Sequence, residues 1–108
     1  MPVFLTGRLL NEQHQPVNDC SLGLDREGAG TEWRGVRPSF REVFPVSPAA
    51  PRVRLIFQCP GYEDAEYVIG RLRTGDWTID DVTVSSKSTI DLGDIIVQAL
   101  PEPLRRSP

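Results

Sequence analysis

The chain has 108 residues, 39% of them hydrophobic and 25% charged, so it is long enough for one buried core and too short for two domains. Its formal net charge of -3 argues against a nucleic-acid partner and against an anionic membrane surface, because both require a positive field. Ten prolines and nine glycines leave little room for long helices and favour a β-rich fold.

The sequence predicts no membrane span, because no run of about eighteen apolar residues is present. Its first residues, MPVFLTGRLL, lack the basic segment and following apolar segment of a secretory signal. We therefore expect a cytoplasmic chain, unless it is a domain taken from a longer secreted protein.

The first part of the chain predicts two strands joined by a polar turn. Residues 3–10 alternate weakly, and Gly7 on their apolar phase predicts a bulge or a close approach by another backbone. Residues 11–19 are turn-forming, with Val17 as the one apolar side chain available to contact the core. Residues 20–25 alternate clearly and predict a second strand.

The next segment predicts a loop and then an edge strand. Residues 25–35, DREGAGTEWRG, are loop-forming, and their GAG is followed by no helix, so we interpret it as a connector and not as a phosphate-binding loop. A third strand begins near Ser39, with Phe40 and Phe44 on one face. Pro45 has no N–H to donate to a sheet, which predicts that this strand lies at an edge or ends there.

The clearest strand of the sequence lies within residues 52–62, RVRLIFQCPGY. It has one apolar face, which a second sheet must cover, formed by Val53, Leu55, Phe57 and Cys59. A type II turn follows at Pro60 and Gly61, because proline presets the φ angle of the first central position and glycine supplies the positive φ of the second.

Two strands and a loop are predicted after this turn. Residues 63–69 alternate as a fifth strand, with a short helix as the alternative. Residues 70–77 are loop-forming. Residues 78–84 form a sixth strand whose alternation slips at Asp80 and Asp81, which predicts a bulge or turn there.

The last strand, residues 90–99, is apolar on both faces at its centre and is therefore predicted to lie inside a sheet. Residues 101–108 lack periodicity and hold three prolines, which predicts a mobile tail. Short strands with turn residues between them predict one all-β domain over residues 1–100, a seven-stranded antiparallel sandwich of two sheets. A closed barrel is the alternative.

The two cysteines, Cys20 and Cys59, lie on the apolar faces of their strands. Two cysteines make neither a metal site nor a disulfide framework, so we favour two small buried hydrophobic side chains. A disulfide between facing strands and a reactive thiol are the alternatives.

Residues suited to catalysis or metal binding are few. His14, the only histidine, lies in a polar turn, and there is no GxSxG motif, so we interpret it as solvated and predict no enzyme. The acidic residues between Asp76 and Asp94 lack the spacing of a calcium loop, and no zinc-ligand cluster is present. We therefore expect no metal and no cofactor.

The predicted binding residues are two tryptophans in charged, loop-like segments and the arginines near them in sequence. Trp and Arg dominate the binding energy of protein interfaces. The plainer interpretation is that each tryptophan covers one open end of the sandwich, and stacking on a sugar is a further alternative. The predicted set is Trp33, Arg34, Arg37, Arg71, Arg73 and Trp77.

Three segments of the chain share a common pattern with known domains. They are a glycine-containing strand followed by a Pro-Val turn and an alternating strand, a strand that ends in Gly-Tyr, and a final strand. Their matching residues are Gly7, Pro16, Val17, Cys20, Leu22, Leu24, Gly61, Tyr62, Leu92, Gly93, Asp94 and Ile95. Taken together, these segments resemble carboxypeptidase regulatory-like and other transthyretin-like domains. The resemblance spans most of the chain, but the first turn has His14-Gln15 in place of that family's Asp-Gly or Asn-Gly, and residues 26–38 match nothing in it.

The resemblance implies a non-enzymatic β-sandwich module for protein–protein interaction or structural support, with another protein or domain as partner. A partner is expected at a sheet edge near Pro45 or at the Trp33 and Trp77 segments. A small-molecule or carbohydrate-binding module is the first alternative. A divergent hydrolase of the hydroxyisourate hydrolase type is the second, although that family's several histidines and C-terminal Tyr-Arg-Gly-Ser are missing here.

Overall fold

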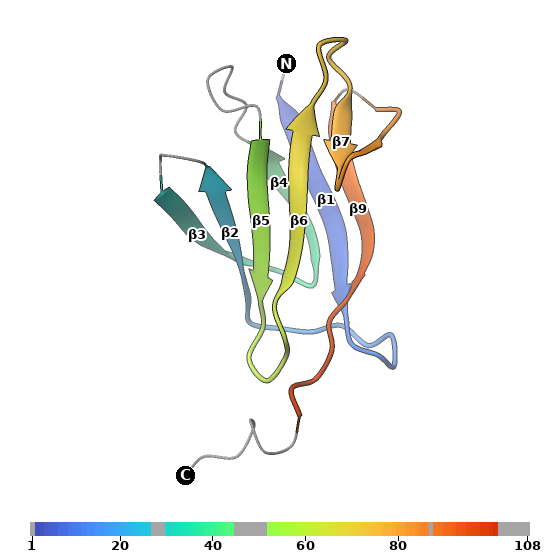
Figure 1. Cartoon of the computed structure of the whole chain (residues 1–108). Coiled ribbons are helices and arrows are strands. Elements are labelled where there is room, and N and C mark those ends of the chain that lie inside the picture. The colour runs from blue at the N-terminus through green and yellow to red at the C-terminus, as the bar shows by residue number, and fades with distance from the viewer. Residues whose placement is uncertain (1, 27–29, 45–51, 87, 102–108) are drawn as a thin grey trace.

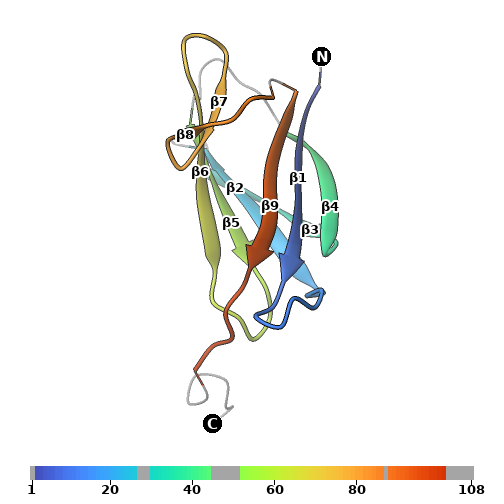
Figure 2. The same cartoon turned by 90° about the vertical axis from the view of Figure 1, so that its right-hand side faces the viewer.

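The computed structural model describes residues 2–26, 30–44, 52–86 and 88–101. Within these ranges the chain is all-β, and nine strands form two sheets that lie face to face (Figures 1 and 2). The strands are β1 (Val3–Leu10), β2 (Cys20–Arg26), β3 (Gly30–Val36), β4 (Ser39–Phe44), β5 (Arg52–Gln58), β6 (Ala65–Arg71), β7 (Trp77–Ile79), β8 (Val82–Thr83) and β9 (Thr89–Ile96).

The two sheets differ in size. The smaller has the strand order β4-β1-β9 and the larger β3-β2-β5-β6-β7-β8. Strands β1 and β9 run parallel, and the other pairings are antiparallel. The predicted class and the two layers are therefore right, whereas the predicted seven strands and the wholly antiparallel arrangement are wrong.

Two segments account for the difference in strand number. The predicted loop, residues 25–35, contains most of β3, which pairs with β2 along its whole length. Residues 78–84, predicted as one strand, belong to two, because Asp80 and Asp81 have φ angles of 48° and 67° and turn the chain between β7 and β8. The turn predicted there is confirmed.

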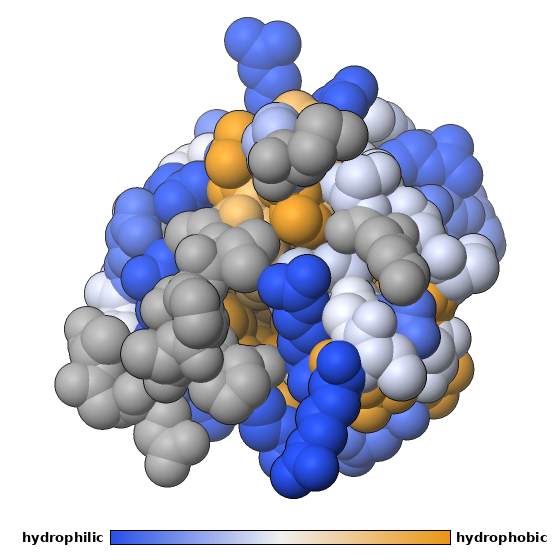
Figure 3. Space-filling view, turned by 90° about the horizontal axis from the view of Figure 1, so that it is seen from above, coloured by the Kyte–Doolittle hydropathy of each residue, from blue (hydrophilic) through white to orange (hydrophobic). Residues whose placement is uncertain are grey.

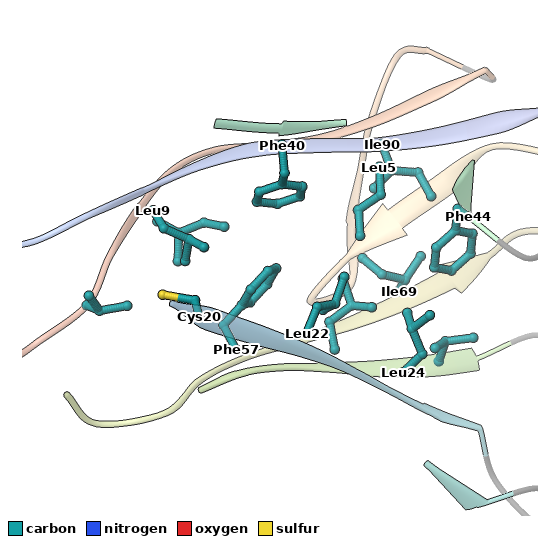
Figure 4. Close-up of a cluster of buried hydrophobic side chains, with 14 of the residues drawn as sticks. Leu5, Leu9, Cys20, Leu22, Leu24, Phe40, Phe44, Phe57, Ile69 and Ile90 are labelled. Atoms are coloured by element: carbon teal, nitrogen blue, oxygen red, sulfur yellow. The ribbon is translucent and has the colours of Figure 1, made fainter. Parts of the chain in front are cut away.

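The core lies between the sheets and is filled by inward-facing side chains from both (Figure 4). Strand β5 buries the apolar face predicted from its alternation, and Phe57 on that face lies at the middle of an aromatic cluster. Its ring centroid lies 5.5 Å from that of Phe40 and 6.2 Å from that of Tyr67. The largest fully buried side chains are Leu5, Leu9, Leu22, Leu55, Phe57, Ile69, Ile90, Ile95 and Val97.

The two turns at one end of the sandwich also form as predicted. Gly61 has a φ angle of 84°, and the N–H of Tyr62 donates to the carbonyl of Cys59 over 3.1 Å, which closes the turn between β5 and β6. In the turn after β1, Val17 is buried, and its N–H donates to the carbonyl of Leu9 over 3.0 Å.

Strand β9 lies at an edge of the smaller sheet, and the prediction of an interior strand is wrong. Gly93 has a φ angle of 67°, and the register of β1 with β9 shifts between Thr6 and Arg8, which marks a β-bulge. The bulge reverses the alternation of side chains, so Ile90 before it and Ile95 after it are both buried. The apolar pattern on both faces therefore reflects a bulge and not an interior position.

Gly7 lies at this bulge, as predicted. A Cβ atom at Gly7 would lie 2.9 Å from the ring of Phe40 and 3.2 Å from the side chain of Ile95. The close approach is therefore made by side chains and not by another backbone. Glycine at this position leaves room for an aromatic ring between the sheets.

Strand β4 lies at an edge, as the sequence predicts. Pro45, which motivated that prediction, lies outside the described residues, and so do residues 102–108 of the predicted tail.

A disulfide bond joins Cys20 to Cys59, whose Cα atoms are 4.2 Å apart. The two residues lie opposite each other in the continuation of the ladder that pairs Ser21 with Gln58. Both are buried, as expected, but the interpretation as separate hydrophobic side chains is wrong. The bond links neighbouring strands of the larger sheet and closes a chain separation of 39 residues.

Removing this bond should destabilise the fold. We expect Cys20→Ala/Cys59→Ala to lower the free energy of unfolding by about 3 kcal/mol, because the bond restricts the unfolded chain. Urea denaturation followed by circular dichroism, with the reduced wild-type chain as a control, measures the difference. Equal midpoints for the oxidised and the reduced chain would contradict the expectation.

Candidate interaction surface

The six predicted binding residues lie at two separate places on the larger sheet. Strands β2 and β5 lie between the two places, so the structure does not bring the tryptophans together. The first group, on β3 and just after it, holds Trp33, Arg34 and Arg37; the second, at the β6–β7 hairpin, holds Arg71, Arg73 and Trp77.

Trp77 is a core residue. It is the first residue of β7 and not part of a loop, and it is 3% exposed. Its ring meets that of Phe44 edge to face at 5.7 Å, and the guanidinium of Arg71 lies 4.8 Å from its ring centroid. Seen from the end of the molecule that holds the β6–β7 hairpin, hydrophilic side chains surround a smaller hydrophobic area (Figure 3). Trp77 thus fits the plainer interpretation of a side chain that completes the core.

Trp33, in contrast, lies on the outer face of the larger sheet and is 46% exposed. It is paired with Gly23 of β2. A Cβ atom on Gly23 would lie 2.7 to 3.0 Å from three atoms of the indole, so the ring rests against the glycine backbone. The next residue across the sheet is Ile56, which is 8% exposed. Trp33, Gly23 and Ile56 therefore form an apolar strip across three strands.

Charged side chains border this apolar strip. The guanidinium of Arg54 lies 3.1 Å from the carboxylate of Asp25 and 3.6 Å from that of Glu66. All three side chains are substantially exposed, so each ion pair contributes at most about 1 kcal/mol to stability. The ion pairs hold charged side chains in place beside the strip but contribute little to the stability of the fold.

The spacing of β2 and β5 shows which backbone groups of the larger sheet are paired. The separation of 4.2 Å between the Cα atoms of Cys20 and Cys59 is that of a residue pair that exchanges no backbone hydrogen bonds. Cys20 therefore directs its N–H and C=O toward β3, and successive residues of β2 alternate in direction. Val68 of β6 supports the same alternation. Its N–H donates to the side-chain carboxylate of Asp80 and its C=O accepts from the N–H of Asp80, so both groups face β7, as the alternation across the sheet requires.

The outer edge of β3 presents the backbone groups of three residues. By the same alternation, Glu32 and Arg34 bond β2, whereas Thr31, Trp33 and Gly35 direct their N–H and C=O away from the sheet. In the described part of the chain no strand pairs with this edge, which lies at the outside of the larger sheet (Figure 1). Such groups are able to pair with a strand of another chain.

The other edges of the two sheets are less suited to pairing. Strand β8 has two residues, and β9 is interrupted by the bulge at Gly93. Strand β4 places the half-buried Glu42 in line with the core residues Phe40 and Phe44, and an inward-facing charge discourages pairing at an edge. Strand β3 has seven residues in continuous register and contains neither proline nor lysine.

The arginines of the first group lie beside this edge but off the apolar strip. Arg34 belongs to the opposite phase of β3 from Trp33, and its guanidinium lies 2.9 Å from the carboxylate of Glu32. Arg37 lines an open groove of about 380 Å³ between β3 and β4, together with Arg41 and Glu42. In the second group, Arg73 is exposed in the β6–β7 hairpin.

His14 is exposed in the turn after β1, with a φ angle of 61°. It lines an open groove of about 310 Å³ with Ser39 and Asp94. The carboxylate of Asp94 accepts a hydrogen bond of 2.8 Å from Arg8. Among the described residues, no hydrogen bond joins the imidazole to either Ser39 or Asp94, so this groove holds no hydrogen-bonded nucleophile and base.

One ionisable group is clearly perturbed. Tyr67 is half-buried, and burial, followed by the negative charge of Asp80, raises the pKa of its phenol above the ordinary value of 10.0. The phenol therefore stays neutral at physiological pH. In the described ranges, no three His, Cys, Asp or Glu side chains are grouped to hold a metal ion, and no helix is long and apolar enough to cross a membrane.

Comparison with known proteins shows similarity in fold. No protein-family model matches the chain, and no curated protein does. A C-terminal fragment of the pilus adhesin SpaC from Lactobacillus rhamnosus GG has a TM-score of 0.64 and 20% identity over 94% of this chain. A further structure of SpaC gives a TM-score of 0.56 and 19% identity over 92% of this chain. This chain spans 46% of the first of those chains and 15% of the second.

The contact between Gly23 and the indole predicts a spectroscopic response. We expect Gly23→Ala to displace Trp33 from the sheet, because the added methyl group would lie within 3.0 Å of the ring. Iodide reaches exposed indoles and should quench the fluorescence of the variant more strongly than that of the wild type. Gly35→Ala is the matched control, because a Cβ atom there meets nothing within 4 Å. Equal quenching in all three proteins would show that the ring does not rest on Gly23.

Proposed function

We propose that this chain is a non-enzymatic β-sandwich module that binds another protein by strand addition at the outer edge of β3. One observation carries the proposal: three residues with outward-facing backbone groups, Thr31, Trp33 and Gly35, lie on a regular edge strand that also bears a half-exposed indole. Added strands gain affinity from main-chain hydrogen bonds and specificity from side chains beside them. Trp33 supplies such a side chain.

The position of Trp33 against Gly23 supports a role in binding an added strand. An exposed aromatic side chain that already rests on Gly23 loses little conformational freedom on binding. The apolar strip extends from the edge to Ile56, so a partner that covers the indole also covers a hydrophobic part of the sheet. The binding energy is therefore expected to concentrate at Trp33.

The resemblance to transthyretin-like domains supports a module of a larger assembly. Such domains are mostly accessory, and the similarly folded pilus adhesin fragment is about twice as long as this chain. We further propose an oxidising compartment, because Cys20 and Cys59 are bonded and disulfides persist where thiols are not kept reduced. This favours a domain of a secreted protein over the cytoplasmic location expected from the sequence.

A carbohydrate is the second candidate partner, favoured by the exposed face of the indole, on which a sugar ring can stack. The charged groups nearest the strip, Arg54, Asp25 and Glu66, are already paired with one another. Strand addition uses the backbone groups of β3 as well as the indole, and for this reason we favour it.

A proline substitution at the outer edge of β3 distinguishes strand addition from carbohydrate binding. We expect Gly35→Pro to abolish strand addition, because the lost N–H faces away from β2 and the β2–β3 ladder keeps its hydrogen bonds. Trp33→Ala should weaken binding of either kind of partner. Affinity capture from an extract of the source organism, quantified by mass spectrometry, compares both variants with the wild type.

Thr83→Pro is the matched control, because Thr83 lies on the short edge strand β8 and its N–H also faces outward. Partners that bind the wild type and Thr83→Pro but neither of the other variants support strand addition at β3. A glycan array probed with the same proteins measures carbohydrate binding. Loss with Trp33→Ala together with retention by Gly35→Pro would favour the carbohydrate. Full retention of partners by both variants would refute the proposal.

A further inference from the structure

We propose that the partner at this edge is a second copy of the chain, so this inference rests on the function proposed above and names its partner. Strand β3 of one copy would lie antiparallel to β3 of the other, on a two-fold axis through Trp33. The larger sheets of the two copies would then form one continuous sheet. Two-fold pairing requires a surface that is complementary to itself, and the sequence of β3 meets that requirement.

The charges of β3 are arranged symmetrically about Trp33. Glu32 precedes it and Arg34 follows it, and both belong to the same phase of the strand. In an antiparallel pair centred on Trp33, Glu32 of each copy faces Arg34 of the other. Two cross-strand ion pairs form, each beside the ion pair of 2.9 Å that joins Glu32 to Arg34 within a copy.

Neighbouring registers lack this complementarity. An axis through Glu32 sets two glutamates opposite each other, and an axis through Arg34 sets two arginines opposite each other, which is destabilising. An axis through Thr31 or Gly35 pairs neither charge with its opposite. The charges therefore favour a single register, the one centred on Trp33.

The backbone groups fit the same register. Thr31 of each copy faces Gly35 of the other, and Trp33 faces Trp33, and these are the residues whose N–H and C=O point outward. The ion pairs then occupy the positions between the hydrogen-bonded pairs, where facing side chains are closest. The backbone groups thus allow axes through Thr31, Trp33 or Gly35, and of these three only the axis through Trp33 also sets opposite charges against each other.

The outer face leaves room for the second copy. Each indole lies toward its own Gly23 on β2, away from the edge. Across the axis each indole faces Trp33 of the other copy, whose ring lies in turn toward its own β2. The other residues of the facing strand on this side are Thr31 and Gly35, one small and one without a side chain. A Cβ atom at Gly35 would meet nothing within 4 Å, so this part of the strand is open to an approaching neighbour.

Charge reversal tests the register. In Glu32→Arg every cross-strand pair joins two arginines, and in Arg34→Glu it joins two glutamates. Sedimentation velocity over a concentration series should therefore show that each variant dimerises about 10- to 100-fold more weakly than the wild type. An equimolar mixture of the two variants restores opposite charges at both pairs and should form heterodimers, which native mass spectrometry identifies. The double variant Glu32→Arg/Arg34→Glu should dimerise like the wild type.

The outcomes separate this inference from the proposed function. A wild-type chain that stays monomeric at its highest soluble concentration overturns the second copy as partner, and so do single variants that dimerise as tightly as the wild type. If the chain does not dimerise but captures a different protein, and Gly35→Pro no longer captures that protein, strand addition at β3 stands with another partner. Circular dichroism of each variant confirms that the fold is retained.

Discussion

The antiparallel pairing of β2 with β5, closed at one end by the Cys20–Cys59 bond, is the constraint on which the rest of the molecule depends. This register directs Leu22 and Leu24 into the core and leaves Gly23 on the outer face. Because β3 pairs only with β2 among the described strands, the same register decides which groups of β3 face outward. A slip by one residue would exchange core and surface along the whole strand.

The inner face of the larger sheet serves stability, and the proposed binding site combines its outer face with the free edge of β3. The inner face buries its aliphatic and aromatic side chains against the smaller sheet, and the outer face bears a thin apolar strip and paired charges. A free edge exposes a protein to indiscriminate association, and the other edges are limited by length, a bulge or an inward charge. In the proposed dimer, the charges of Glu32 and Arg34 would limit pairing at β3 to a strand whose charges complement theirs.

Much of the fold could be predicted from local patterns, and the free edge of β3 could not. The alternation of residues 52–59 and the Pro60-Gly61 turn specify their own structure. Strand β3 was missed because an edge strand beyond the core needs no apolar face, so TEWRG shows no alternation. The bulge at Gly93 disguised the alternation of β9 in a similar way. The contact of Trp33 with Gly23 depends on the pairing of two strands, and a single sequence does not reveal that register.

The most direct test of the free edge is amide hydrogen exchange of β3, measured by NMR. In dilute solution we expect slow exchange for the amides of Glu32 and Arg34, which bond β2, and fast exchange for those of Thr31, Trp33 and Gly35. The three fast amides should become protected once a strand is added. Uniform protection of all five amides in the free chain would show that the β3 edge is not free, and persistent fast exchange of the outward three when the partner is bound would show that no strand is added there.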